Sequence, residues 1–182
     1  PLSRSALIDL LNNENSFDEQ DSASFDGKGL HILAVDDHLP NLIVLEALLG
    51  ELNVTTTKAQ SGQEALGILQ QRIEQGQQPF DLIFMDIQMP VMSGVDTTRA
   101  IRSLESTLEN HKRLPIIALT AHALADEKQK LLKVGMDDYV TKPIQIEQII
   151  QILTHWTTQS FNKLPAVEKA IVIEALDPQV LD

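Results

Sequence analysis

Five polar side chains in this 182-residue chain stand at the ends of apolar runs that have the character of buried strands: Asp36, Asp37, Asp86, Thr120 and Lys142. Three carboxylates held close together repel one another, and a hard divalent cation such as Mg²⁺ relieves that repulsion in an all-oxygen site. A lysine and a hydroxyl beside the metal match the charge that develops on a phosphoryl group during transfer. These residue types therefore predict Mg²⁺-dependent phosphoryl chemistry, with a carboxylate as the nucleophile.

The five side chains can act together only if the strands that carry them are parallel neighbours. Between residues 30 and 156, strand and helix patterns alternate five times, which predicts an α/β doubly wound parallel sheet with helices on both faces. Sites in such sheets lie beyond the carboxyl ends of the strands. Asp86 is the best candidate nucleophile, because it stands alone on the expected central strand. The expected strands cover 30–35, 53–59, 81–86, 114–120 and 137–141, and the expected helices 39–51, 61–73, 93–104, 122–134 and 143–156.

Each of these polar residues also has an ordinary structural interpretation. An Asp after a strand, such as Asp36 or Asp37, is most often a turn former or a helix N-cap. Thr120 could cap the helix that follows it, and Lys142 could be a solvated residue before a proline turn. What favours a shared site is that all of them fall at the same end of successive strands.

Composition excludes several classes of function. The formal charge is −12 and no segment is basic, so we expect no direct nucleic-acid binding. Cysteine is absent, which rules out disulfides and thiolate metal sites and fits a cytoplasmic location. No apolar run approaches the length of a membrane span and no signal-peptide pattern is present, so we expect no direct membrane contact.

The two flanks differ from the central region. Residues 12–29 have the composition of an acidic flexible linker. In residues 1–11 six positions, counted from Pro1, match the pattern of the expected last helix, counted from Pro143, and only Arg4 opposite Ile146 departs from it. Two interpretations stay open: this segment is the last helix of a preceding, similar module, or two amphipathic helices that start with proline match by chance. We expect residues 157–182 to be a second linker.

Four segments, "AVDDHLPN", "FMDIQMPVMSG", "ALTAHA" and "DDYVTKP", resemble in order and spacing the signature segments of response-regulator receiver domains. The resemblance covers about residues 30–156 and implies a flavodoxin-like five-stranded fold. It also implies that Asp86 is the phosphoacceptor and that Asp36 and Asp37 are the acidic pair around Mg²⁺. In this family a backbone carbonyl two residues after the phosphoacceptor is a further metal ligand, which here belongs to Gln88.

The same resemblance implies roles for three more residues. Thr120 would grip the phosphoryl group in the active state, Lys142 would pair with it, and Tyr139 would be the aromatic that changes rotamer, although an ordinary edge-strand aromatic is an equally simple interpretation of Tyr139. Gln88 and His122 stand where side chains tune dephosphorylation in the family. The departures from the family pattern, including His38 where Asn is common, do not touch the proposed chemistry.

The sequences of these segments are most similar to those of receivers in hybrid sensor histidine kinases of the BarA/GacS type. That resemblance implies a histidine kinase core and a histidine phosphotransfer domain as partners in the same parent protein, which could be anchored in the inner membrane. Residues 1–11 would then end a degenerate receiver, and residues 157–182 would lead towards the phosphotransfer domain. Only 24 residues follow Thr158, so no helix-turn-helix fits there.

Three alternatives remain open from the sequence. The first is a stand-alone response regulator without a DNA-binding output. The second is a haloacid-dehalogenase-like Mg²⁺ phosphatase, but that superfamily has an acid two residues after the nucleophile, where this chain has Gln88. The third is a non-catalytic interaction module of receiver fold, and the presence of all five polar residues argues against it.

Overall fold

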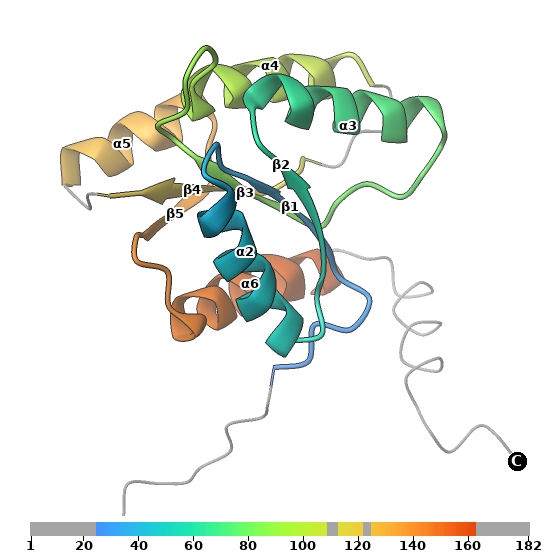
Figure 1. The fold of residues 1–182 in the computed structure, drawn as a ribbon. Coiled ribbons are helices and arrows are strands. Elements are labelled where there is room, and N and C mark those ends of the chain that lie inside the picture. The colour runs from blue at the N-terminus through green and yellow to red at the C-terminus, as the bar shows by residue number, and fades with distance from the viewer. Residues whose placement is uncertain (1–24, 109–112, 122–124, 163–182) are drawn as a thin grey trace, which may run out of the picture.

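The fold is a single parallel sheet between two layers of helices. The computed structural model describes residues 25–108, 113–121 and 125–162, and its five strands are ordered β2-β1-β3-β4-β5. Figure 1 shows α2 and α6 on one face of the sheet and α3, α4 and α5 on the other. The elements are β1 (His31–Val35), α2 (Leu39–Glu51), β2 (Thr55–Ala59), α3 (Gly62–Glu74), β3 (Leu82–Asp86), α4 (Gly94–Ser106), β4 (Ile116–Thr120), α5 (Ala125–Val134), β5 (Asp138–Thr141) and α6 (Ile146–Asn162).

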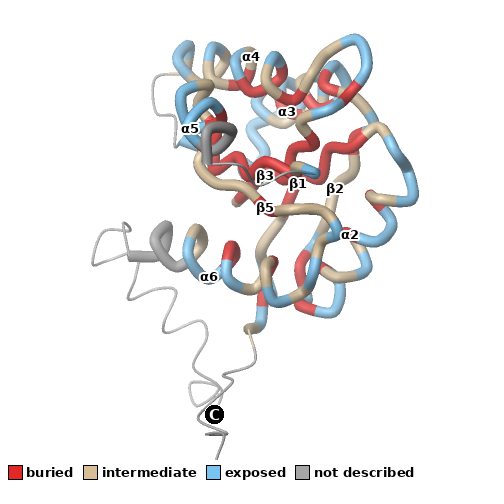
Figure 2. The backbone as a smooth tube through the Cα atoms, turned by 90° about the vertical axis from the view of Figure 1, so that its left-hand side faces the viewer, coloured by how far each residue is buried: buried red, intermediate tan, exposed pale blue. Residues whose placement is uncertain are grey.

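Two apolar cores cover the two faces of this sheet. Successive side chains of a strand point to opposite faces, so Ile32 and Ala34 of β1 enter the core under α2 and α6. Leu33 and Val35 enter the core under α3, α4 and α5. In Figure 2 the red, buried segments concentrate in the central strands. The predicted doubly wound sheet is confirmed, with β3 as its central strand.

The last helix starts later than the sequence predicts. It begins at Ile146, and Pro143 lies before it in a bend. The backbone N–H of Gln145 donates to the side-chain oxygen of Gln148, 3.1 Å away, which is one half of a capping box and fixes the start of the helix. The interpretations of residues 1–11 and of most of the two linkers lie outside the described residues.

Serine caps place the first turns of two helices at the carboxyl edge of the sheet. Ser61 Oγ accepts the N–H of Glu64 at 3.2 Å at the start of α3, as the sequence predicts. Ser93 Oγ accepts the N–H of Asp96 at 3.2 Å at the start of α4. Such caps satisfy helix N–H groups that have no partner inside the helix, so both helices begin close to the strand ends where the polar residues gather.

The start of α4 presses directly on the backbone of Asp86. A Cβ atom at Gly94 would lie 2.1 Å from the Asp86 carbonyl oxygen, far inside any normal contact. The N–H of Gly94 donates to the carbonyl of Ile87 at 3.0 Å, and Thr98 Oγ1 donates to the Gly94 carbonyl at 2.8 Å. Only glycine permits this approach, which holds the backbone under Asp86 in place.

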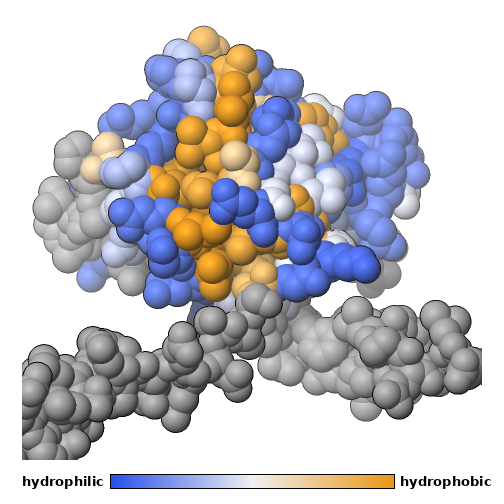
Figure 3. Space-filling view, turned by 60° about the horizontal axis from the view of Figure 1, so that its bottom comes forward, coloured by the Kyte–Doolittle hydropathy of each residue, from blue (hydrophilic) through white to orange (hydrophobic). Residues whose placement is uncertain are grey.

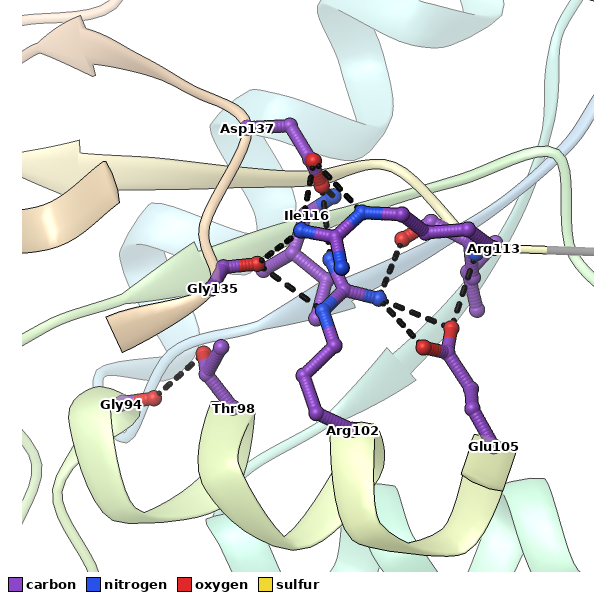
Figure 4. A network of polar contacts seen from close by, with 9 residues as sticks. Gly94, Thr98, Arg102, Glu105, Arg113, Ile116, Gly135 and Asp137 are labelled. Atoms are coloured by element: carbon purple, nitrogen blue, oxygen red, sulfur yellow. Dashed lines mark hydrogen bonds and ion pairs between the residues drawn. The ribbon is translucent and has the colours of Figure 1, made fainter. Parts of the chain in front are cut away.

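A polar network ties α4 to the amino ends of β4 and β5, at the other edge of the sheet (Figure 4). The guanidinium of Arg102 donates to the Asp137 carboxylate at 2.7 Å and to the Gly135 carbonyl at 2.9 Å. The Asp137 carboxylate also accepts the N–H of Ile116 at 2.9 Å and pairs with the exposed Arg113 at 3.0 Å. Arg102 also pairs with Glu105 at 2.8 Å. Because Asp137, Arg102 and Glu105 are all almost buried, their charges depend on one another rather than on water.

Replacing Gly94 with alanine should destabilise the fold by about 2–3 kcal/mol, because the new methyl group overlaps a backbone oxygen that cannot move freely. Gly67 is the matched control: it lies in the exposed middle of α3, and a Cβ there meets nothing within 4 Å. Gly67→Ala should stabilise by about 0.5–1 kcal/mol through helix propensity. Urea unfolding of the two variants measures both effects, and equal stabilities would contradict the close approach at Gly94.

Removing the Asp137 carboxylate should cost about 2–3 kcal/mol, because Asp137→Ala takes one of two carboxylates from the almost buried Arg102 guanidinium and leaves the Ile116 N–H without an acceptor. Arg113→Ala removes an exposed partner of the same carboxylate and should cost less than about 1 kcal/mol. Thermal unfolding of both variants checks this. A loss as large for Arg113→Ala as for Asp137→Ala would show that the network does not depend on burial.

Candidate functional site

Three carboxylates meet at the carboxyl edge of the sheet, as the sequence predicts. Asp86 is the last residue of β3 and is buried. Asp36 and Asp37 follow β1, which pairs with β3 in parallel register up to Val35 opposite Met85. Asp36 is buried as well, whereas the side chain of Asp37 keeps partial access to solvent. Because β1 and β3 are parallel neighbours, the three acids lie at the same edge of the sheet.

Lys142 reaches these carboxylates from the β5 edge of the sheet. It follows β5, and its Nζ lies 2.7 Å from Asp36 Oδ2 and 3.1 Å from Asp86 Oδ1. Its backbone N–H donates to the carbonyl of Thr120 at 2.8 Å, which anchors the residue beside β4. One ammonium group therefore bridges two buried acids that would otherwise repel each other.

The two adjacent acids after β1 have different surroundings. Asp36 accepts the N–H of His38 at 2.8 Å, both of its oxygens lie within 3.1 Å of Asn41 Nδ2, and Lys142 completes its partners. Asp37 Oδ1 is buried, and no described residue donates a hydrogen bond to it. The Nδ1 atom of His38 lies 3.1 Å away and forms an ion pair with it only when the imidazole is protonated. Asp36 is thus saturated, while Asp37 keeps an oxygen for a ligand.

The polar residues surround a cleft of about 190 Å³. Its lining residues are His38, Asn41, Asp86, Gln88, Leu119, Thr120, Ala121 and Lys142. Gln88 lies beside the nucleophile candidate, with its N–H 3.4 Å from Asp86 Oδ1. The structure therefore brings Asp36, Asp86, Gln88, Thr120 and Lys142 together in one place, while His122 lies outside the described residues.

Burial and the neighbouring charges shift two pKa values in this cleft. Burial raises the pKa of Asp86, and the negative charge of Asp36 adds to this, although Lys142 opposes both effects. For Lys142, burial acts to lower the pKa, but its hydrogen bonds to Asp36 and Asp86 outweigh burial and raise it. Lys142 therefore stays protonated, while burial disfavours the charged form of Asp86, an effect that a bound cation would oppose.

The donor atoms present fit a magnesium ion. The unpartnered oxygen of Asp37, the carboxylate of Asp86 and the carbonyl of Gln88 are hard oxygen ligands from the same edge of the sheet. Ligand atoms of Asp36, Asp37 and His38 all lie within 4.8 Å of one another. Since Asp36 already has protein partners for both oxygens, Asp37 is the better placed of the pair for direct coordination.

Tyr139 lies on the edge strand β5 opposite Ala118, and its partly buried side chain packs against the core under α3, α4 and α5. This position is compatible with both interpretations made from the sequence, an aromatic that changes rotamer and an ordinary edge-strand aromatic. Asn41 was given no role by the sequence, yet it donates to Asp36 from the first turn of α2. Its position five residues after Asp36 was the signal, because the first turn of a helix after a strand faces back over the strand end.

Relatives with curated descriptions carry this segment inside much longer proteins. The chain is 41% identical over 181 residues to the sensor histidine kinase GacS of Pseudomonas protegens, covering 98% of this chain and 19% of GacS. It is 40% identical over 126 residues to the histidine-protein kinase BarA of Escherichia coli, covering 69% of this chain and 12% of BarA. The chain thus spans less than a fifth of these relatives, and no helix in its described ranges has the length and apolar character to cross a membrane.

Solved structures share the fold and parts of the sequence. The receiver domain of the kinase PA1611 from Pseudomonas aeruginosa, with a magnesium ion coordinated in its active-site cleft, has a TM-score of 0.59 and 38% identity over 70% of this chain and 97% of that one. The receiver domain of Ssk1 in complex with the histidine phosphotransfer protein Ypd1, from Saccharomyces cerevisiae, has a TM-score of 0.63 and 31% identity over 72% and 90% of the two chains.

The family model of the response regulator receiver domain matches residues 32–154, which contain the whole sheet except the first residue of β1, and the cleft at its carboxyl edge. Together with 41% identity to GacS over 98% of this chain, this match shows that the chain belongs to the response regulator receiver domain family of two-component signalling.

Proposed function

We propose that this receiver takes a phosphoryl group from a phosphohistidine onto Asp86, with Mg²⁺, as a step in a phosphorelay. The observation that carries the proposal is the position of Asp86 at the tip of the central strand, inside a cleft where Lys142 contacts it. At the same edge of the sheet, Asp37 keeps an oxygen without a hydrogen-bond partner among the described residues. A carboxylate held this way is a fixed nucleophile, and fixed geometry supplies much of the rate of phosphoryl transfer.

The transfer exchanges one bond to phosphorus for another. An oxygen of the ionised Asp86 attacks phosphorus while the bond between phosphorus and the histidine nitrogen breaks. The electron pair of that bond leaves with the imidazole nitrogen, which takes up a proton. Hydrolysis later reverses the change at Asp86: water attacks phosphorus, the carboxylate is released, and inorganic phosphate leaves.

Mg²⁺ would be held by Asp37, Asp86 and the backbone carbonyl of Gln88. Asp36, whose oxygens already have protein partners, would act on the ion through its negative charge. When bound, the ion supplies positive charge that offsets the negative charge of the carboxylates and of the arriving phosphoryl oxygens. Lys142 adds a second positive charge from the β5 side, because it already touches Asp86.

Thr120 and Tyr139 are proposed as the elements that respond to the phosphoryl group. Thr120 lines the cleft and can donate its hydroxyl to a phosphoryl oxygen. The new dianionic group would draw Thr120 towards Asp86. Tyr139 on β5 would then change rotamer and fill the space that Thr120 leaves. Tyr139 lies on the edge strand, where a rotamer change meets fewer neighbours than in the sheet centre.

The likeness to GacS and BarA supports a hybrid sensor histidine kinase as the parent protein. In such a parent, a histidine kinase core and a histidine phosphotransfer domain would be the partners, the receiver would face the cytoplasm, and the parent would be anchored in the inner membrane. The complex of the related Ssk1 receiver with Ypd1 supports a phosphotransfer protein as the exchange partner. A stand-alone response regulator is the second candidate for the architecture, and the haloacid-dehalogenase-like phosphatase is disfavoured because Gln88 replaces the second acid in the cleft.

Mg²⁺ should stabilise the chain against unfolding, because it binds the folded carboxylates and not the unfolded chain. At a hundredfold excess over Kd the gain should be about 2–3 kcal/mol, and a chelator should remove it. Asp37→Asn should abolish most of the gain. Glu74→Gln removes one negative charge from the exposed end of α3 and should keep it. Thermal unfolding with and without Mg²⁺ measures the difference, and an equal gain in Asp37→Asn would contradict direct coordination by Asp37.

Incubation with Mg²⁺ and acetyl phosphate should add a single phosphoryl group to the chain, and intact-mass measurement should show that Asp86→Asn does not acquire it. Lys142→Ala should lower the rate of labelling by roughly 10²-fold or more, because the transition state loses a contacting cation. Asp96→Asn, a change at an exposed acid on α4, should leave labelling unchanged.

The same assay separates the remaining candidates. Rapid release of inorganic phosphate from varied phosphomonoesters would favour the phosphatase. A chain that acquires no phosphoryl group from acetyl phosphate, phosphoramidate or a phosphohistidine protein would be an interaction module. Labelling that survives in Asp86→Asn would contradict the assignment of the nucleophile.

A further inference from the structure

His38 stands at the start of a helix without using its side chain there. It is the N-cap residue of α2, yet its side chain makes no cap hydrogen bond. Asparagine, aspartate, serine or threonine would serve this position better, because their side-chain oxygen accepts a helix N–H, and a missing cap costs about 1 kcal/mol. The local structure of α2 therefore does not explain a histidine at this position.

The imidazole of His38 faces the acids instead. Its Nδ1 atom lies 3.1 Å from Asp37 Oδ1 and 3.8 Å from Asp36 Oδ1. The backbone N–H of His38 donates to the Asp36 carboxylate at 2.8 Å, which holds the residue in place, and His38 lines the cleft that contains Asp86. From the sequence we expect His38 to leave the chemistry untouched, whereas the structure places its ring against the acids.

The positions of Nδ1 and Oδ1 fit two ligands of one cation. Asp37 Oδ1 is buried and accepts no hydrogen bond from any described residue, and such an oxygen is costly to leave without a partner. Two ligands about 2.1 Å from a metal, at neighbouring corners of an octahedron, lie about 3.0 Å apart. The 3.1 Å between Nδ1 and Oδ1 is close to that spacing. Because the His38 side chain is 70% exposed, solvent can supply further ligands.

An ion pair between a protonated His38 and Asp37 is the simpler interpretation of the same distance. A pair that is exposed on one side contributes about 0–1 kcal/mol, no more than the cap that histidine forgoes. A cation shared by Nδ1 and Oδ1 would satisfy both atoms more strongly. The two interpretations differ in whether the imidazole binds a metal, which can be measured.

The rest of the first turns of α2 offers a cation little. The first turn contains no acidic residue, and Asn41 already donates its amide group to both oxygens of Asp36. The exposed side chains on the outer side of the helix are apolar: Leu39, Ile43 and Val44. In Figure 3 the side of α2 and α6 is turned forward, and apolar atoms gather there in one band. His38 is therefore the side chain through which the start of α2 can act on a bound cation.

We propose that His38 is a nitrogen ligand of the cation that Asp37 holds, so that this receiver binds a divalent first-row transition metal more tightly than an all-oxygen site would. This inference rests on the function proposed above and names the class of cation that the same site prefers. Imidazole suits Fe²⁺, Co²⁺, Ni²⁺ and Zn²⁺, whereas Mg²⁺ prefers oxygen ligands. The oxygens alone would hold Mg²⁺, and His38 would add affinity only for a transition metal.

Titrations of the 182-residue chain with Co²⁺ and Mg²⁺ test the proposal. Isothermal titration calorimetry measures the affinity for each cation in the unaltered chain and in His38→Asn. Loss of the nitrogen ligand should weaken Co²⁺ binding by roughly tenfold to a hundredfold and leave Mg²⁺ binding within about twofold. Because asparagine is a good N-cap, the unfolding midpoint without metal should stay equal or rise in His38→Asn.

Proton NMR of the Co²⁺-bound chain detects the ligand directly, without any measurement of activity. Ring protons of an imidazole bound to paramagnetic Co²⁺ shift far outside the normal proton range. Such signals should appear in the unaltered chain, vanish in His38→Asn and weaken in Asp37→Asn. His155→Asn is the matched control: His155 is exposed on α6, where its ring contacts Trp156, and its loss should change neither the signals nor the Co²⁺ affinity.

Each other outcome has one meaning. Equal Co²⁺ affinity in His38→Asn, or no shifted ring signals in the unaltered chain, overturns the proposal and leaves His38 as an ion-pair partner of Asp37. An equal loss of affinity for Co²⁺ and Mg²⁺ overturns the selectivity. Shifted signals that persist unchanged in Asp37→Asn also overturn the proposal, because the bound imidazole would then lie away from the acids. A chain that binds neither cation and takes no phosphoryl group from acetyl phosphate would contradict the proposed function itself.

Discussion

The repulsion between three carboxylates at one edge of the sheet is the constraint on which the rest of this structure depends. Asp36 and Asp86 are buried, and buried charges persist only with a partner. Lys142 is that partner for both, at 2.7 Å and 3.1 Å. A single ammonium group does not neutralise three acids, so the site keeps an excess of negative charge that a divalent cation would balance. The structure thus keeps a site that is electrostatically costly by itself and ready for a cation.

Holding such a site together requires rigid support on both sides of it. Gly94 lets α4 approach the backbone of Asp86, and the cap at Ser93 fixes where α4 starts. At the far end of the same helix, Arg102 connects it to the starts of β4 and β5 through Asp137. The strand that carries the nucleophile and the strand that leads to the lysine are therefore connected through one helix.

Much of this could be predicted from the sequence, because the signals are local. The alternation of apolar runs and helical patterns predicts the doubly wound sheet. Because such sheets place their sites at the carboxyl ends of the strands, the sequence also predicts that Asp36, Asp86, Thr120 and Lys142 lie close together. The cap at Ser61 was also predictable, since a serine followed three residues later by glutamate is a local pattern. The start of the last helix was not, because Pro143 is compatible with a first turn and the Gln148 contact that moves the start to Ile146 depends on the folded loop.

Only the tertiary structure determines that the adjacent acids Asp36 and Asp37 have different hydrogen-bond partners and therefore different roles. Asp36 and Asp37 are neighbours in sequence and chemically identical, and only the positions of Asn41, His38 and Lys142 saturate the first and leave the second with an unpartnered oxygen. The exposure of Ile43 could not be predicted either, because the type of an apolar residue does not tell whether its side chain is buried or exposed. By itself the sequence determined which groups stand at the strand ends; burial and hydrogen-bond partners, which belong to the fold, determined what each of those groups is free to do.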